Sequence, residues 1–244
     1  MLTTKLTNIA EAIRTKTGKT DKMLLDTMPS EILSIETGGG EGSNLDILRY
    51  VTNAGIISLN VFGKSDVVLN LDNVTNFANM FSITTEENRN NTVEHLTINC
   101  PNLVTSFLNT FVCAYALRDL TLKRITLNVN TQNVTAFQST FNCLIALEVI
   151  DGFPLNLTKA TTTLNIFNYC NALKEVRFVE NTISVAMNLN SCGNLSNDTI
   201  NSIIDGLVDL TGTTAQTLKF NTAVRDALTD EQIARVTSKN WSLT

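Results

Sequence analysis

The feature that most constrains the fold is a sequence unit that recurs along the middle of the chain. One copy reads Asn133-Val134-Thr135-Ala136-Phe137, continues through Phe141-Asn142-Cys143 and closes on Leu147. The fuller copies close on Leu117, Leu147, Leu173 and Leu195, with spacings of about 22 to 30 residues, which are typical of solenoid repeats. Because a unit this short cannot bury its own apolar face, stacked copies are expected to share one continuous core.

Two patterns within the unit predict its local structure. The phenylalanines occur in pairs four residues apart, as in Phe77 and Phe81, which places both rings on one face of a short helix or helical turn. The same spacing joins Phe107 to Phe111 and Phe137 to Phe141. The alternation in Leu120-Thr121-Leu122 predicts a short strand. The sequence therefore predicts an α/β solenoid of short strands and helical turns.

Four of the five cysteines recur at nearly the same place in each unit: Cys113, Cys143, Cys170 and Cys192. No CxxC pair occurs, so they are expected to be reduced, buried thiols that fill the space where segments pack closely. A metal site is the alternative, but the long spacings and the single histidine do not match a zinc-ligand pattern.

The N-terminal part has a different organisation. Residues 1–37 predict two short helices with apolar edges, and the Gly-rich stretch at 38–43 predicts a flexible linker. Helices this short are marginal in isolation, so residues 1–37 are expected to dock on a partner or on a second copy, giving a homo-oligomer. The expected docking residues are Leu6, Ile9, Ile13, Ile32 and Ile35.

The repeats, at residues 73–195, are expected to lie between two caps. Residues 44–72 predict a β cap, with alternating stretches at 56–61 and 67–71. Residues 196–244 predict an α-helical cap that includes one further strand at 217–220. Thr229 and Gln232 have the spacing of a capping box, which marks the start of the last helix.

Composition excludes several classes of function. The 244 residues are 43% hydrophobic and only 17% charged, with 30 Asn and 35 Thr in place of the missing charge. A net charge of -5 and the lack of a basic block disfavour nucleic-acid binding. There is no apolar run of 18 residues and no signal-peptide core, so we expect no membrane-spanning helix and synthesis in the cytoplasm.

The sequence offers little for catalysis, and no enzymatic activity, cofactor or metal is expected. His95 is the single histidine, and no nucleophile pattern surrounds it. Gly18-Lys19-Thr20 resembles the end of a P-loop, but Ile13 stands where a glycine is required. Paired carboxylates of a glycan hydrolase are the alternative. The candidates are Glu86 with Glu87, Asp119 with Glu148, and Glu175 with Asp151, each more simply a solvated surface charge.

The repeat, Phe-x-x-Cys-x-x-Leu followed by Leu-x-x-Leu-x-Leu, resembles the leucine-rich repeats of bacterial surface proteins of the BspA-like class. The resemblance covers about residues 73–220. It implies a leucine-rich-repeat-type solenoid.

Both ends of the chain carry a second resemblance. Ile9-Ala10-Glu11-Ala12-Ile13-Arg14 and the stretch through Met28-Pro29-Ser30-Glu31-Ile32 resemble a leader of tail and baseplate proteins of phages and prophages. The ending at 209–241 resembles the ends of repeat proteins encoded in such tail modules. The resemblance implies a virion component, assembled with other tail or baseplate proteins.

Two roles are therefore expected. The first is a phage-tail appendage that docks through its leader and presents the repeats for structural or receptor binding, with a host surface glycan or protein as a possible ligand. The second is a bacterial surface adhesin. For the first role the ligand face is expected on the exposed column of the sheet, at Thr97, Thr121, Asp151, Arg177 and Lys219. The alternative is that this column is merely solvated.

Overall fold

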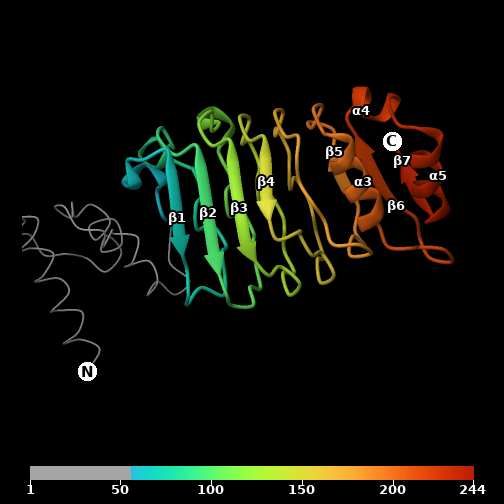
Figure 1. Cartoon of the computed structure of the whole chain (residues 1–244), viewed down its shortest axis with the longest axis horizontal. Helices are drawn as coiled ribbons and strands as arrows, with labels where there is room; N and C mark the ends of the chain where they lie inside the picture. Colours follow the sequence, from blue (N-terminus) through green and yellow to red (C-terminus); the bar gives the residue numbers. More distant parts are fainter. Residues whose placement is uncertain (1–55) are drawn as a thin grey trace, which may run out of the picture.

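A computed structural model describes residues 56–244, which form a mixed α/β fold with parallel sheets and few helices. The expected docking residues lie outside this range, as do residues 38–43 and the first part of the N-terminal cap. The described chain is elongated, with residue 56 towards one end and the C-terminal helices at the other (Figure 1).

Seven strands form two parallel sheets. The first sheet has the order β1 (Asp66–Asn70), β2 (His95–Cys100), β3 (Arg124–Val129) and β4 (Val149–Gly152). The second has the order β5 (Met187–Leu189), β6 (Gln216–Phe220) and β7 (Trp241–Leu243). Three α-helices are described, all near the C-terminus: α3 (Asn197–Gly206), α4 (Thr222–Asp226) and α5 (Asp230–Ser238).

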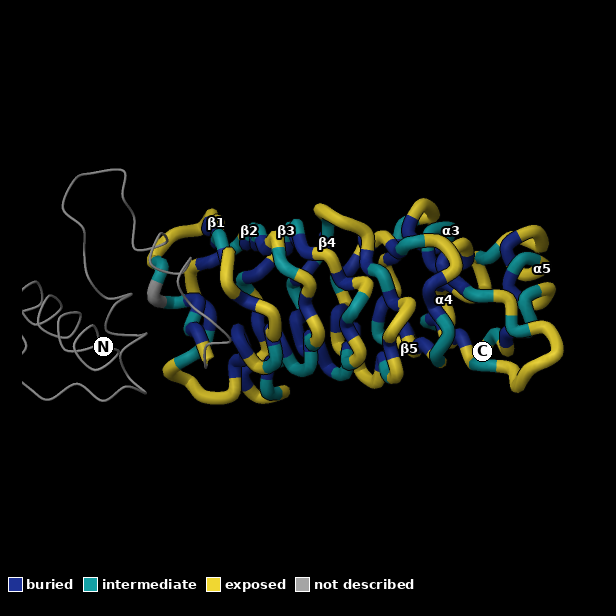
Figure 2. Tube along the Cα trace, turned by 90° about the horizontal axis from the view of Figure 1, so that it is seen from below, coloured by how far each residue is buried: buried dark blue, intermediate teal, exposed yellow. Residues whose placement is uncertain are grey.

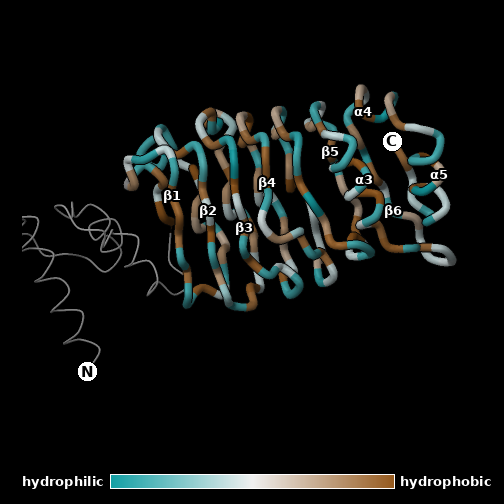
Figure 3. Tube along the Cα trace, in the orientation of Figure 1, coloured by the Kyte–Doolittle hydropathy of each residue, from teal (hydrophilic) through white to brown (hydrophobic). Residues whose placement is uncertain are grey.

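The register brings equivalent residues into line across the first sheet, with an offset of 29 residues from β1 to β2 and from β2 to β3, and of 25 residues from β3 to β4. Asp66 pairs with His95, 29 residues later, and His95 pairs with Arg124. Along β2, buried Leu96 and Ile98 alternate with more exposed neighbours, as a strand with one covered face requires. Figure 3 shows the resulting alternation of apolar and polar residues along the strands.

The core runs the length of the described chain as a band of buried residues (Figure 2). Its centre holds two rows of stacked phenylalanine rings, with centroids 5.1 to 6.0 Å apart and nearly parallel planes. One row contains Phe77, Phe107 and Phe137, and the other contains Phe81, Phe111, Phe141 and Phe167. The leucines that close the sequence units are buried as well.

The helical turn expected around each phenylalanine pair is wrong. Asn79 lies between Phe77 and Phe81 with a φ of 62°, and Asn109 and Ser139 have the same left-handed conformation in the next segments. A left-handed residue ends a right-handed helix. The amide N–H of Phe77 instead donates to the carbonyl of Ser106 in the neighbouring segment. The segment closes a tight turn instead, in which Met80 N donates to the carbonyl of Phe77, and hydrogen bonds to the neighbouring segment complete the backbone pairing.

Polar side chains form rows that parallel the aromatic ones. In the first sheet, Asn99 Nδ2 donates to Asn70 Oδ1, and Asn128 Nδ2 donates to Asn99 Oδ1, both at 2.8 Å. Thr135 Oγ1 donates to the carbonyl of Thr105 in the preceding segment. Amides and hydroxyls that bridge adjacent segments explain how so weakly charged a chain satisfies its polar groups.

Two expected strands are placed differently by the structure. Residues 59–62 form a one-turn 3-10 helix, whereas the strand expected at 67–71 is confirmed as β1. The strand expected at Leu120–Leu122 is wrong: these residues precede β3, and Leu120 is 59% exposed. Asp119 forms a turn there by accepting from the amides of Thr121 and Leu122, so the strand begins only at Arg124.

The C-terminal region combines helices with strands. The capping box of Thr229 and Gln232 is confirmed at the start of α5, and the strand expected at 217–220 is confirmed as β6. Strand β7 follows α5 and was not anticipated, so the cap is not purely helical.

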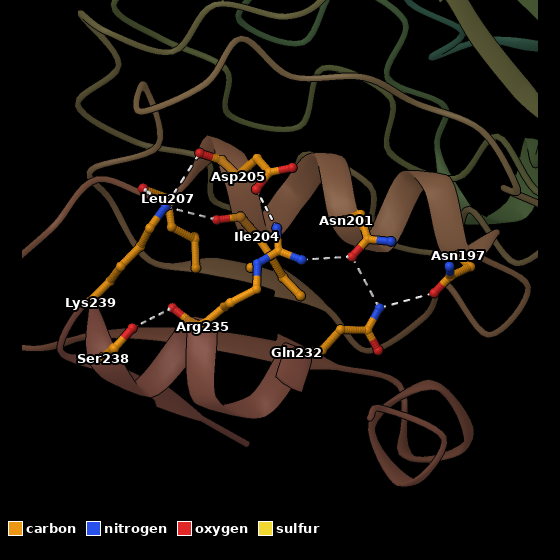
Figure 4. A network of polar contacts seen from close by, with 9 residues as sticks. All are labelled: Asn197, Asn201, Ile204, Asp205, Leu207, Gln232, Arg235, Ser238 and Lys239. Carbon is orange, nitrogen blue, oxygen red and sulfur yellow. Dashed lines mark hydrogen bonds and ion pairs between the residues drawn. The ribbon is translucent and has the colours of Figure 1, made fainter. Parts of the chain in front are cut away.

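Helix α5 is joined to α3 by a polar network (Figure 4). Gln232 Nε2 donates to Asn197 and Asn201, and Arg235 contacts Asn201 and Asp205. Lys239 Nζ donates to three carbonyls at the C-terminal end of α3, a favourable place for a positive charge. The network fixes the position of α3, which forms one wall of the candidate site.

Candidate functional site

The candidate site is a groove of about 600 Å³ between the end of β4, the segment 175–178 and helix α3. The groove lies at the edge of the first sheet that is next to helix α3. The polar side chains that line it include Asp151, Glu175, Arg177, Asp198, Asn201 and Asp205.

Helix α3 lies beside the segment that follows β4, at the position where a further strand would extend the first sheet. Val149 forms a parallel bridge with Glu175, so the segment after β4 continues the row of strands. The amides on its far side are satisfied by helix side chains: Val176 N donates to Thr199 Oγ1 at 3.1 Å, and Phe178 N donates to Ser202 Oγ at 2.9 Å. The helix thereby covers a sheet edge that would otherwise attract another strand.

The sequence of α3 explains this position. Ser196 Oγ accepts from Thr199 N and caps the helix. Ile203 and Ile204 are fully buried against the core. A residue larger than Gly206 would meet Ile183, since an added Cβ would lie 2.8 Å from its Cδ1. The polar face of α3 is left towards the groove.

The groove is predominantly acidic. Five carboxylates line it, from Asp151, Glu175, Glu180, Asp198 and Asp205, against the single guanidinium of Arg177. Asp151 is paired with Arg124 and accepts from Thr126, and Asp205 is paired with Arg235. Two of the five carboxylates are therefore already neutralised by an arginine.

The groove lining contains no histidine or cysteine, and the Thr199 and Ser202 hydroxyls already accept hydrogen bonds from backbone amides. Within residues 56–244, no group of three or more His, Cys, Asp or Glu side chains could hold a metal ion.

The expected ligand face is brought together only in part. Thr97 lies on β2 in the same row as Thr126 and Asp151, and Asp151 shares the groove with Arg177. Thr121 is not on the sheet: it lies in the turn before β3, where its Oγ1 donates to the carbonyl of Asn90.

Lys219 is also separate from this face, because it lies on β6 and pairs with Asn188 in the second sheet. The single column expected from the sequence is thus divided between two sheets and a turn. Thr126 was missed, although the alternation of Ile125, Leu127 and Val129 around it marks a strand.

Of the carboxylate pairs considered from the sequence, only one has both members lining the same site. Glu86 is ion-paired with Arg89, and Glu148 with Lys174. Asp119 is buried, and its carboxylate accepts from two backbone amides and from Asn90 Nδ2. Burial raises the pKa of the Asp119 carboxyl above its ordinary value, and the hydrogen bonds only partly offset this. Glu175 and Asp151 are the pair that lines one site, the groove.

All five cysteines are free and buried, as expected. Burial raises the pKa of Cys113 and of Cys192 to about 12, so both thiols stay protonated at neutral pH. Cys170 Sγ donates to the carbonyl of Phe141 at 2.9 Å. The thiols of Cys100, Cys170 and Cys192 thus donate to carbonyls of a preceding segment.

Comparisons with protein families, with curated proteins and with solved structures find no match to the chain. Among residues 56–244, no helix has the length and apolar character that crossing a membrane requires.

Proposed function

We propose that the chain is a non-enzymatic component of a phage tail or baseplate. Residues 1–37 dock on the particle, and the remainder forms a leucine-rich-repeat-type solenoid that serves as structural material or contacts the host surface. The sequence resemblances of the leader, the repeats and the ending support this proposal.

The observation that carries the proposal is the directional arrangement of the described chain: it is elongated, and its N-terminal and C-terminal parts lie towards opposite ends (Figure 1). Parallel segments stack in register, and their aromatic rows run along the same direction. The described residues begin towards one end of this body, and the C-terminal helices lie at the other (Figure 1). A module of this form can be attached at its N-terminal end while its length stays accessible, which suits an appendage.

The groove is the surface we propose for ligand contact within this function. It is formed at the break between the first sheet and α3, and its acidic lining favours a partner with positive or hydrogen-bond-donating groups. Other tail proteins and further copies of the chain are the partners we propose for residues 1–37.

A bacterial surface adhesin is the second candidate, since the repeats resemble those of surface proteins. The same elongated body would then present its face from the cell envelope.

Fractionation of a lysate from the source separates the two candidates. Tail-like particles are purified and probed with an antibody to residues 44–244, for the full chain and for a variant lacking residues 1–37. A variant with Asp151→Asn is the matched control, because it changes the groove and leaves the leader intact. The tail proposal predicts signal on particles that is lost only with the deletion. Signal on particle-free cell envelopes would overturn it in favour of an adhesin.

A further inference from the structure

Two of the chain's three tyrosines meet at the surface, away from the groove. The ring centroids of Tyr115 and Tyr169 lie 5.0 Å apart at an angle of 60°. They are 55% and 41% exposed, although large aromatic side chains elsewhere in the described chain are mostly buried. The surface also exposes single large apolar side chains such as Leu120, Phe153 and Leu164, whereas Tyr115 and Tyr169 are exposed rings that contact each other, which makes them a candidate contact site.

The fold brings the two rings together across an intervening segment. Cys113 N donates to the carbonyl of Asn142, and Cys143 N donates to the carbonyl of Asn168, so three segments lie side by side. Tyr115 begins a one-turn 3-10 helix that is anchored by buried Leu117. Tyr169 directly follows Asn168 on the third segment.

Arg118 completes the cluster. Its Cζ lies 4.4 Å from the centroid of the Tyr115 ring, a cation–π contact. No carboxylate of residues 56–244 forms an ion pair with Arg118, whereas four of the other five arginines described are ion-paired. Stacking fixes the plane of the guanidinium and leaves its N–H donors available for a planar anion.

The backbone at Tyr169 is strained in a way that supports this placement. Its φ of 58° is left-handed, a conformation that costs about 1 kcal/mol or more for an aromatic residue. Most of the other non-glycine residues with positive φ are asparagines, which tolerate it well. The chain therefore keeps a ring where an asparagine would be less strained.

We propose that Tyr115, Arg118 and Tyr169 form a binding site for an anionic saccharide. The exposed face of Tyr169 stacks on the apolar face of a sugar ring, and Arg118 binds the carboxylate or phosphate that the sugar carries. This site is distinct from the groove, whose acidic lining would repel such a ligand.

The surroundings favour a saccharide over a protein partner. A stable protein interface needs roughly 800 Å² on each side and a hydrophobic centre. Here only two rings and one guanidinium come together, and the rings line none of the described hollows. A shallow aromatic platform with one oriented cation matches a sugar ring with a single negative group.

The test is a calorimetric titration of the purified full chain with trigalacturonate, neutral galactotriose, glucose 6-phosphate and inorganic phosphate. Trigalacturonate should bind with a dissociation constant near the millimolar range, and galactotriose at least about tenfold more weakly. Phosphate alone should bind more weakly than a phosphorylated sugar, glucose 6-phosphate, because it cannot stack. The readout uses purified protein, so it can fail or succeed independently of the tail assignment.

Variants locate the binding. Arg118→Gln and Tyr169→Asn should each weaken trigalacturonate binding by about tenfold, whereas Arg225→Gln on α4 should have no effect. Tyr169→Asn removes the ring but suits the left-handed backbone, so the melting temperature should not fall. Equal binding of galactotriose, or binding that survives both variants, would overturn the proposal. The absence of binding by any probe at about 10 mM would also overturn the proposal, and would favour a protein partner for this cluster.

Discussion

Asn99 lies in the middle of a hydrogen-bonded row, donating to Asn70 and accepting from Asn128. Its side chain is half-buried. The high content of Asn and Thr was visible in the sequence, but its role was not. Composition does not show which amides align, because alignment depends on a strand register that three-dimensional stacking sets.

The asparagine row predicts that substitutions at its middle and at its end change the free energy of unfolding by different amounts. Asn99→Ala removes two side-chain hydrogen bonds, and we expect a loss of about 1–3 kcal/mol in the free energy of unfolding. Asn70→Ala removes one and should cost about half as much. Chemical denaturation of both variants measures the difference. Equal losses would contradict the role of Asn99 as the bridging residue.

Asp119 predicts a pH dependence of stability. Its pKa is raised by burial, so the folded state binds more protons than the unfolded state between about pH 4 and the raised value. The contribution of Asp119 to stability should therefore fall as the pH rises through this interval, and then level off.

Asp119→Asn isolates that contribution. The difference in free energy of unfolding between wild type and variant should decrease with rising pH, as measured by denaturation at a series of pH values. An increase with pH, which an ion-paired carboxylate would produce, would contradict the assignment.

At the scale of elements, the starts of α3 and α5 were predicted, whereas the start of α4 and the turns were not. Ser196 and the pair Thr229 and Gln232 are local signals that need only neighbouring residues, so α3 and α5 begin where expected. The turn at Asn79 was missed because four-residue spacing of phenylalanines fits both a helix and a left-handed turn between stacked segments. The partner segment that decides between them is distant in sequence.

Helix α3 predicts a specific loss when its sheet contact is removed. Thr199→Val keeps the side-chain volume but leaves the buried amide of Val176 without its acceptor, at a cost of about 1–3 kcal/mol. Thr222→Val, at an exposed position in α4, should change stability by less than about 0.5 kcal/mol. Thermal unfolding of the two variants provides the comparison, and an equal effect would contradict the edge-covering role.

At the scale of the whole molecule, the sequence predicted a mixed α/β chain with a shared core, and the parallel sheets confirm that coarse description. The recurring phenylalanines were sufficient to predict the shared core, because they mark equivalent positions whose side chains can stack. The groove was not predicted as such. Asp151 and Arg177 were chosen as a sheet column, and only the position of α3 turns them into one wall of a hollow.

The aromatic rows predict that a change in the middle of the body affects all of it. Phe111 stacks between Phe81 and Phe141, so Phe111→Ala should cost about 3–5 kcal/mol and increase amide exchange in segments on both sides. Val236→Ala in α5, at one end, should raise exchange mainly in the C-terminal region. Exchange confined to one segment in the Phe111 variant would contradict a continuous core.

The central proposal is that the chain is an appendage of a phage tail. Immunogold electron microscopy of purified tail particles, with an antibody to residues 44–244, tests it most directly. The account predicts label at a fixed place on the tail or baseplate. Unlabelled tails together with labelled bacterial envelopes would contradict it.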